Sequence, residues 1–119
     1  MNARIGLVLD CTDPAELAPF WSEALGYVTL GGSGSHVLLV DPERAGPQLL
    51  LQAVPEPKAG KNRMHVDIKA IDVDGEASRL EALGARRLEA GTRHELGTRW
   101  VLMADPDGNE FCVCARGYR

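Results

Sequence analysis

The tetrapeptide Glu-Ala-Leu-Gly stands at residues 23–26 and again at residues 81–84. Each copy ends a stretch in which apolar residues recur at helical intervals, and an aspartate precedes each stretch, Asp13 in the first and Asp72 in the second. The two copies are 58 residues apart and the two aspartates 59 residues apart. Self-similarity at a nearly fixed spacing indicates an internal repeat. The sequence therefore predicts two copies of one structural unit.

The length and composition are typical of one globular domain, residues 1–119, with 45% hydrophobic and 25% charged residues. No apolar run approaches the roughly 20 residues that span a bilayer, and no signal peptide is evident, so we expect a cytoplasmic protein without a membrane partner. A formal net charge of -4 argues against nucleic acid as a partner. The cysteines, Cys11, Cys112 and Cys114, are odd in number and lack the spacing of a zinc site, which predicts reduced thiols.

The first unit, module one, covers residues 1–54 and is predicted to have the order β-α-β-β-β. Its helix is the clearest element, because Asp13 is a good N-cap, Pro14 suits the first helical position and Gly26 suits the end. The apolar residues between them, Trp21 included, favour one face that packs on a sheet. The strands are expected at residues 5–9, 27–30, 36–40 and 48–54.

The stretch 55–62, with two prolines, a glycine and two lysines, is predicted to be a linker. Module two, residues 63–119, repeats the order of module one, with a helix between Asp72 and Gly84. Its strands are expected at residues 63–70, 86–89, 99–104 and 110–115.

Two such modules, each with a helix that ends in Leu-Gly, and an Asp-Pro-Asp-Gly-Asn turn at residues 105–109, resemble the vicinal oxygen chelate superfamily. The glyoxalase-like and bleomycin-resistance-like branch is most similar, and the clearest stretches are 9–27, 61–67, 80–86 and 105–112. The resemblance implies an α+β fold in which two tandem βαβββ modules form a cup-shaped mixed sheet with the helices outside. It also implies a ligand or metal inside the cup and a homodimer.

Strand alternation predicts which side chains face the helices and which face the cup. The helix-facing rows are expected to be Ile5, Leu7 and Leu9; Met64, Val66, Ile68 and Ala70; and Phe111 and Val113. The cup-facing rows are expected to be Gly6, Val8 and Asp10; Gln48, Leu50 and Gln52; His65, Asp67 and Lys69; and Glu110, Cys112 and Cys114.

Metal-binding members of the superfamily take ligands from the first and last strands of each module. By the repeat, these positions correspond to Gly6, His65, Cys112 and one residue of the stretch 48–52, namely Gln48, Leu50 or Gln52. Only His65 is a typical ligand, whereas catalytic metal sites generally use about three protein ligands. We therefore expect neither a metal nor another cofactor.

His65 is the candidate catalytic residue, since an imidazole transfers protons near neutral pH. Asp67 lies on the same predicted face and is in a position to orient it. Glu110 is either a base at the cup rim or an exposed carboxylate at a strand end, and Trp100, beside the polar loop 92–99, either stacks on a ligand or packs in the core. The expected ligand-binding residues are Leu50, Gln52, His65, Asp67, Trp100, Glu110 and Cys112.

Lys69 is expected to pair with Asp67 or Asp10, and Cys112 and Cys114 are expected to be small buried residues, not nucleophiles. His36 and His94 receive no role.

Three functions follow. The first is a metal-free glyoxalase-like protein that binds a small organic molecule in its cup, with or without acid-base chemistry at His65. The second is a metal-dependent lyase or dioxygenase in which His65, a glutamine and Cys112, or an unforeseen group, hold the ion. The third is a non-catalytic interaction module.

Overall fold

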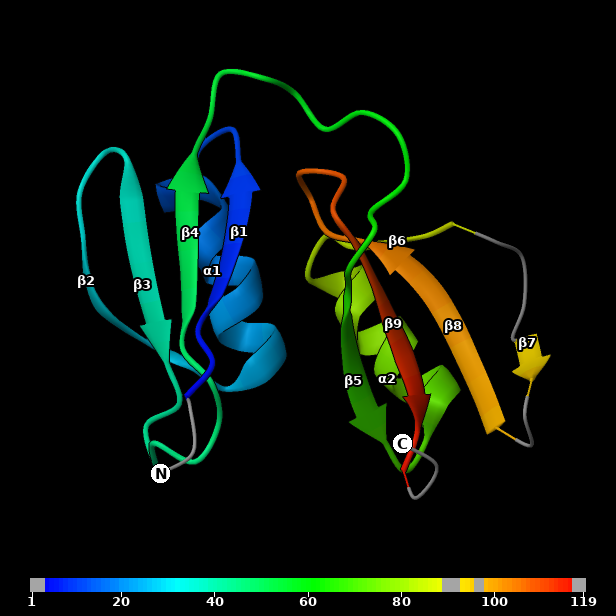
Figure 1. Ribbon diagram of the computed structural model, residues 1–119. Coiled ribbons are helices and arrows are strands. Elements are labelled where there is room, and N and C mark those ends of the chain that lie inside the picture. The colour runs from blue at the N-terminus through cyan, green and yellow to red at the C-terminus, as the bar shows by residue number, and fades with distance from the viewer. Residues whose placement is uncertain (1–3, 89–92, 96–97, 117–119) are drawn as a thin grey trace. The chain divides into compact units, whose positions relative to one another are not determined.

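The computed structural model describes residues 4–88, 93–95 and 98–116. The chain divides into two compact units, residues 1–58 and 59–119, and this boundary lies inside the stretch expected to be a linker. Each unit contains one helix and one sheet (Figure 1). The chain is therefore an α+β protein made of two tandem modules.

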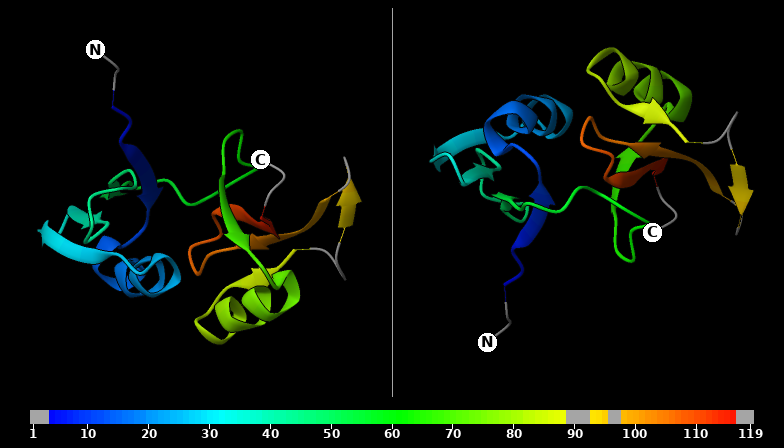
Figure 2. Two further views of the ribbon diagram at one scale, coloured as in Figure 1. Left: turned by 90° about the horizontal axis from the view of Figure 1, so that it is seen from below. Right: turned by 90° about the horizontal axis from the view of Figure 1, so that it is seen from above.

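Module one follows the predicted order. It contains β1 (Leu7–Cys11), α1 (Pro14–Leu25), β2 (Val28–Gly32), β3 (His36–Val40) and β4 (Leu49–Ala53). The strands lie in the order β1-β4-β3-β2, with β1 parallel to β4 and the other neighbours antiparallel. This mixed sheet packs on α1 through one face, as Figure 2 shows.

The helix α1 begins and ends where the sequence predicts. The side chain of Asp13 accepts hydrogen bonds from the backbone N–H groups of Ala15 and Glu16, which have no partner within the helix. Gly26 ends the helix with φ 70°, a left-handed conformation that glycine adopts without strain. The helix buries Phe20 and Trp21 in edge-to-face contact with ring centroids 5.1 Å apart, which confirms Trp21 as a core residue.

Module two repeats this architecture with one addition. It contains β5 (Val66–Ala70), α2 (Val73–Ala82), β6 (Arg86–Arg87), β7 (Arg93–Glu95), β8 (Thr98–Ala104) and β9 (Glu110–Ala115). The strands lie in the order β5-β9-β8-β6, β5 is parallel to β9, and β7 pairs with β8. The sequence does not predict the strand β7, because its segment is polar and is typical of a loop. The predicted end of β6 at Glu89 falls outside the described residues.

The second helix has the same design as the first. Asp72 accepts a hydrogen bond from the backbone N–H of Gly75 at its N-cap, and Val73, Ala77 and Leu80 are buried against the sheet. None of the helices in the described residues is long and apolar enough to cross a membrane.

Two of the predicted helix-facing rows are wrong in their first residue, which is Ile5 in one row and Met64 in the other. Ile5 and Met64 precede the strands that they were assigned to, and they are 73% and 81% exposed. The pairing explains this result, because β1 and β5 begin only where β4 and β9 provide hydrogen-bonding partners, at Leu7 and Val66. In β9 both alternating rows are buried, Phe111 and Val113 as well as Cys112 and Cys114.

The strand register settles which residue of module one corresponds to Cys112. Leu7 pairs with Leu49 in module one, and Val66 pairs with Phe111 in module two. One residue further along, Leu50 therefore corresponds to Cys112. Neither Gly6 nor Leu50 carries a metal-ligating side chain, so the repeat leaves the typical ligand positions of module one without donors.

Candidate functional site

The candidate site lies on the face of the module-two sheet opposite α2, which we call the open face. Its residues alternate along each strand with the buried residues that face the helix. Cross-strand pairs place Asp67 beside Cys112 and Lys69 beside Cys114. The open face carries Asp67 and Lys69 from β5, Cys112 and Cys114 from β9, and Trp100 and Leu102 from β8.

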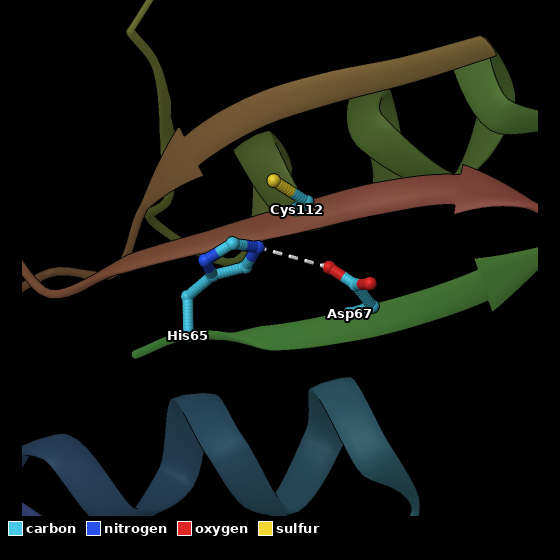
Figure 3. Close-up of side chains that lie close together, drawn as sticks. All are labelled: His65, Asp67 and Cys112. Carbon is cyan, nitrogen blue, oxygen red and sulfur yellow. Dashed lines mark ion pairs between the residues drawn. The ribbon is translucent and has the colours of Figure 1, made fainter. Parts of the chain in front are cut away.

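Three predicted site residues converge on this face. His65 immediately precedes β5, Asp67 lies within it, and Cys112 lies opposite on β9 (Figure 3). The Nε2 atom of His65 is 3.1 Å from Oδ1 of Asp67, and one donor atom from each of the three residues lies within 4.8 Å of the other two. The structure therefore brings together an imidazole, a carboxylate and a thiol.

The burial of these groups differs. The side chain of His65 is 35% exposed and that of Asp67 20%, whereas Cys112 is buried. The Asp67 carboxylate therefore lies beside the His65 ring, which remains open to a ligand.

Glu110 has a different environment from the exposed one expected for it. Its side chain is only 14% exposed and lies 3.3 Å from the Lys61 ammonium. Its Oε1 also accepts a hydrogen bond from the backbone N–H of Asn62, and the Asn62 side chain donates to the Glu110 carbonyl oxygen. These contacts attach the segment before β5 to the start of β9, which is a structural role. The exposed strand-end interpretation of Glu110 is wrong.

Trp100 and Lys69 also lie on the open face. Trp100 pairs across the strands with Cys114 and is half-buried. Burial raises the pKa of the Cys114 thiol, and the charge of Lys69 opposes this effect only in part. Cys114 is therefore protonated near neutral pH, in keeping with the expected role as a small buried residue.

The predicted site residues of module one, Leu50 and Gln52, lie on the corresponding face of the other sheet. Leu50 pairs with Leu38 and is half-buried. Gln52 donates a hydrogen bond to Asp10 at 3.0 Å, and its Oε1 lies 3.3 Å from Nε2 of His36.

His36 received no role from the sequence, yet it completes this polar row. Its Nδ1 lies 3.0 Å from the Ser35 hydroxyl, so the row runs from Asp10 through Gln52 and His36 to Ser35. The sequence predicts the strand that begins at His36 with the correct bounds. It does not predict the register between β3 and β4, which sets His36 opposite Gln52.

The convergent residues of module two also suit a divalent metal. Imidazole nitrogen, carboxylate oxygen and cysteine sulfur are all zinc ligands, and three is the usual number of protein ligands in a catalytic site. Donor atoms bound to one tetrahedral ion at about 2.0–2.3 Å lie about 3.3–3.8 Å apart. The three donor atoms fall within 4.8 Å of one another, so small side-chain rotations are sufficient to bring all three to one ion. Asp67 is the ligand that the sequence prediction did not count.

The two tandem modules and their mixed sheets agree with the fold that the resemblance to the vicinal oxygen chelate superfamily implies. Residues 6–114 match the family model described as a glyoxalase-like domain, and the chain belongs to that family. A search of curated proteins gave no match.

Solved structures of the same fold are similar over nearly their whole length. A fosfomycin resistance protein, FosX, from Listeria monocytogenes is 15% identical with a TM-score of 0.77, covering 99% of this chain and 96% of that chain. A glyoxalase/bleomycin resistance protein/dioxygenase family enzyme from Burkholderia phytofirmans PsJN is 14% identical with a TM-score of 0.76, covering 92% and 94%. A lactoylglutathione lyase from Agrobacterium tumefaciens is 21% identical with a TM-score of 0.68, covering 98% and 95%. At these identities the likeness shows the fold alone.

Proposed function

We propose that the protein binds a small organic molecule on the open face of module two without a metal, and that His65 exchanges a proton with it. The observation that carries the proposal is the pair formed by His65 and Asp67, 3.1 Å apart, with the imidazole partly exposed beside Cys112. Two structures of the same fold are named for lactoylglutathione and for fosfomycin, which are small organic molecules.

The proposed chemistry is acid-base catalysis. A neutral His65 accepts a proton from an acidic C–H or O–H group of the ligand, and the imidazolium that forms is attracted by the carboxylate of Asp67. When the same ring returns the proton to another carbon of the ligand, the net reaction is an isomerisation. When it protonates a leaving group as the bond between that group and carbon breaks, the net reaction is an elimination. Proton transfer of this type contributes about 10²–10⁴-fold to a rate.

A second candidate function is binding of a divalent ion by His65, Asp67 and Cys112. The distances between their donor atoms favour it. When bound, such an ion would polarise a carbonyl or hydroxyl oxygen of the ligand as a Lewis acid.

Metal analysis and ligand binding separate the two candidates. Purified protein is analysed for zinc, nickel, manganese and iron, and a metabolite library is screened by the rise in thermal stability that ligands cause. Under the metal-free proposal, the wild type holds no stoichiometric metal, treatment with EDTA leaves the hits unchanged, and His65→Ala and Asp67→Asn lose them. Glu43→Gln, on an exposed loop of module one, is the control.

Stoichiometric metal that disappears in both His65→Ala and Cys112→Ser overturns the metal-free proposal in favour of the second candidate. A library without any hit, in a protein that also lacks metal, supports the third function, an interaction module.

We also propose that the protein is a cytoplasmic homodimer, which rests on its composition and on its family. Light scattering after size-exclusion chromatography tests the assembly against the chain mass of 12.9 kDa. A mass of one chain contradicts the dimer. Fractionation of cells tests the location.

A further inference from the structure

Module one contains a cavity that is separate from the open face of module two. Its lining residues belong to the start of β1, the end of β3 and the loop between β3 and β4. Figure 1 shows these segments at one end of the module-one sheet. Its volume is about 960 Å³, and the segments 4–7, 40–41 and 44–48 line it. All of these residues belong to one module, so the cavity does not depend on how the modules are arranged.

The polar groups of the cavity are mainly cationic. Arg4 and Arg44 both line it, and within the described residues neither has an ion-pair partner. Gln48 adds a side-chain amide. In a chain with a net charge of -4, two guanidinium groups without a carboxylate partner form a local cationic site.

Asp41 is the acidic residue of the cavity, and its carboxylate is occupied. Its oxygens accept hydrogen bonds from the backbone N–H groups of Glu43, Ala45 and Gly46. These bonds lower the pKa of Asp41, so it stays charged, and the cavity carries one net positive charge. The bonds also fix the loop that carries Arg44.

Arg44 has a backbone conformation that arginine rarely adopts. Its φ is 58°, in the left-handed region that favours glycine or asparagine. The surrounding loop enforces this conformation, since the Arg44 N–H also donates to the Asp41 carbonyl oxygen at 2.9 Å. A residue held against its preference, whose charge pairs with none of the carboxylates in the described part of the chain, is a candidate for ligand contact.

The rest of the cavity is apolar. Ile5 is largely exposed and contributes to the wall together with Leu7, Val40 and Pro47. An exposed isoleucine beside two arginines suits a ligand with an apolar body and an anionic group.

We propose that this cavity binds a small amphipathic oxyanion, a carboxylate or phosphate attached to an apolar group. Arg4 and Arg44 form charge-assisted hydrogen bonds with the oxyanion, and Ile5 and Pro47 contact the apolar part. This binding is distinct from the function proposed for module two.

Nuclear magnetic resonance titrations of the full chain test the proposal with three probes: benzoate, the neutral isostere benzamide, and inorganic phosphate. Benzoate is expected to shift the backbone amide signals of Leu7, Gly46 and Gln48, and benzamide to leave them unchanged. Inorganic phosphate shows whether an oxyanion without an apolar group is sufficient for binding. Binding should weaken as sodium chloride is added.

Arg44→Gly removes the guanidinium and also relieves the backbone, so it should fold at least as well as the wild type while binding benzoate about tenfold more weakly. Arg4→Gln should have an effect of similar size, and Arg63→Gln, an exposed arginine outside the cavity, should have none. The proposal is overturned if benzoate and benzamide bind equally, if neither anion shifts the three signals, or if Arg44→Gly binds benzoate as the wild type does.

Discussion

At the scale of single residues, the candidate site combines the partly exposed side chains of His65 and Asp67 with the buried thiol of Cys112. His65 immediately precedes β5 and Asp67 lies within it, two residues further along, and their side chains are 3.1 Å apart. Cys112 reaches them only because β9 lies beside β5. The proximity of His65 to Asp67 thus follows from their positions in the sequence, whereas the position of the Cys112 thiol depends on the pairing of β5 with β9.

Asp41→Asn should destabilise the protein in a way that depends on pH. The backbone hydrogen bonds lower the pKa of Asp41 below its ordinary value of 3.8, so the carboxylate stabilises the fold above that value and the contribution is lost as the pH falls below it. Asparagine offers one acceptor oxygen where Asp41 uses both. Urea unfolding should show the mutant less stable at pH 7, with the difference shrinking below pH 3.8. An equal difference in stability between wild type and Asp41→Asn at pH 7 and below pH 3.8 contradicts this prediction.

At the scale of elements, caps and close backbone contacts set the shape of each module. Both helices begin at an aspartate N-cap, and the strands β2 and β3 approach closely at a glycine. A Cβ atom at Gly32 would lie 2.9 Å from the His36 carbonyl oxygen, whereas one at Gly31 would meet nothing within 4 Å. The β2–β3 hairpin therefore needs glycine at one of two neighbouring positions.

Gly32→Ala should lower the free energy of unfolding by about 1–3 kcal/mol, because the backbone must move to relieve the contact. Gly31→Ala is the matched control in the same strand and should change stability little. Urea denaturation of both variants measures the difference. Equal stability of the two variants would show that the hairpin adjusts freely.

Asp13→Ala should lower the free energy of unfolding by about 1 kcal/mol, since the Ala15 N–H loses its side-chain acceptor and the Glu16 N–H keeps only the Asp13 carbonyl oxygen. Asp13→Asn retains an acceptor oxygen and should be less affected. Thermal unfolding monitored by circular dichroism compares the two. If Asp13→Asn lost as much stability as Asp13→Ala, the negative charge near the helix N-terminus would be the cause of the stabilisation.

At the scale of the whole molecule, the two modules are expected to unfold together as a single domain. Each module contains one tryptophan, Trp21 in module one and Trp100 in module two. Trp100→Phe and Trp21→Phe therefore report one module each. In both variants the fluorescence and circular dichroism transitions in urea should coincide. Separate transitions would contradict the prediction of one domain.

The sequence by itself determined the tandem order of elements, both helix caps and the buried positions in β9, because these depend on patterns within a few residues. Only the tertiary structure decided that Leu50 corresponds to Cys112, that Cys112 joins His65 and Asp67, and that His36 meets Gln52. Each of these depends on the register between strands, which loop lengths and strand starts fix. A difference of one residue in register would reverse the face of every side chain.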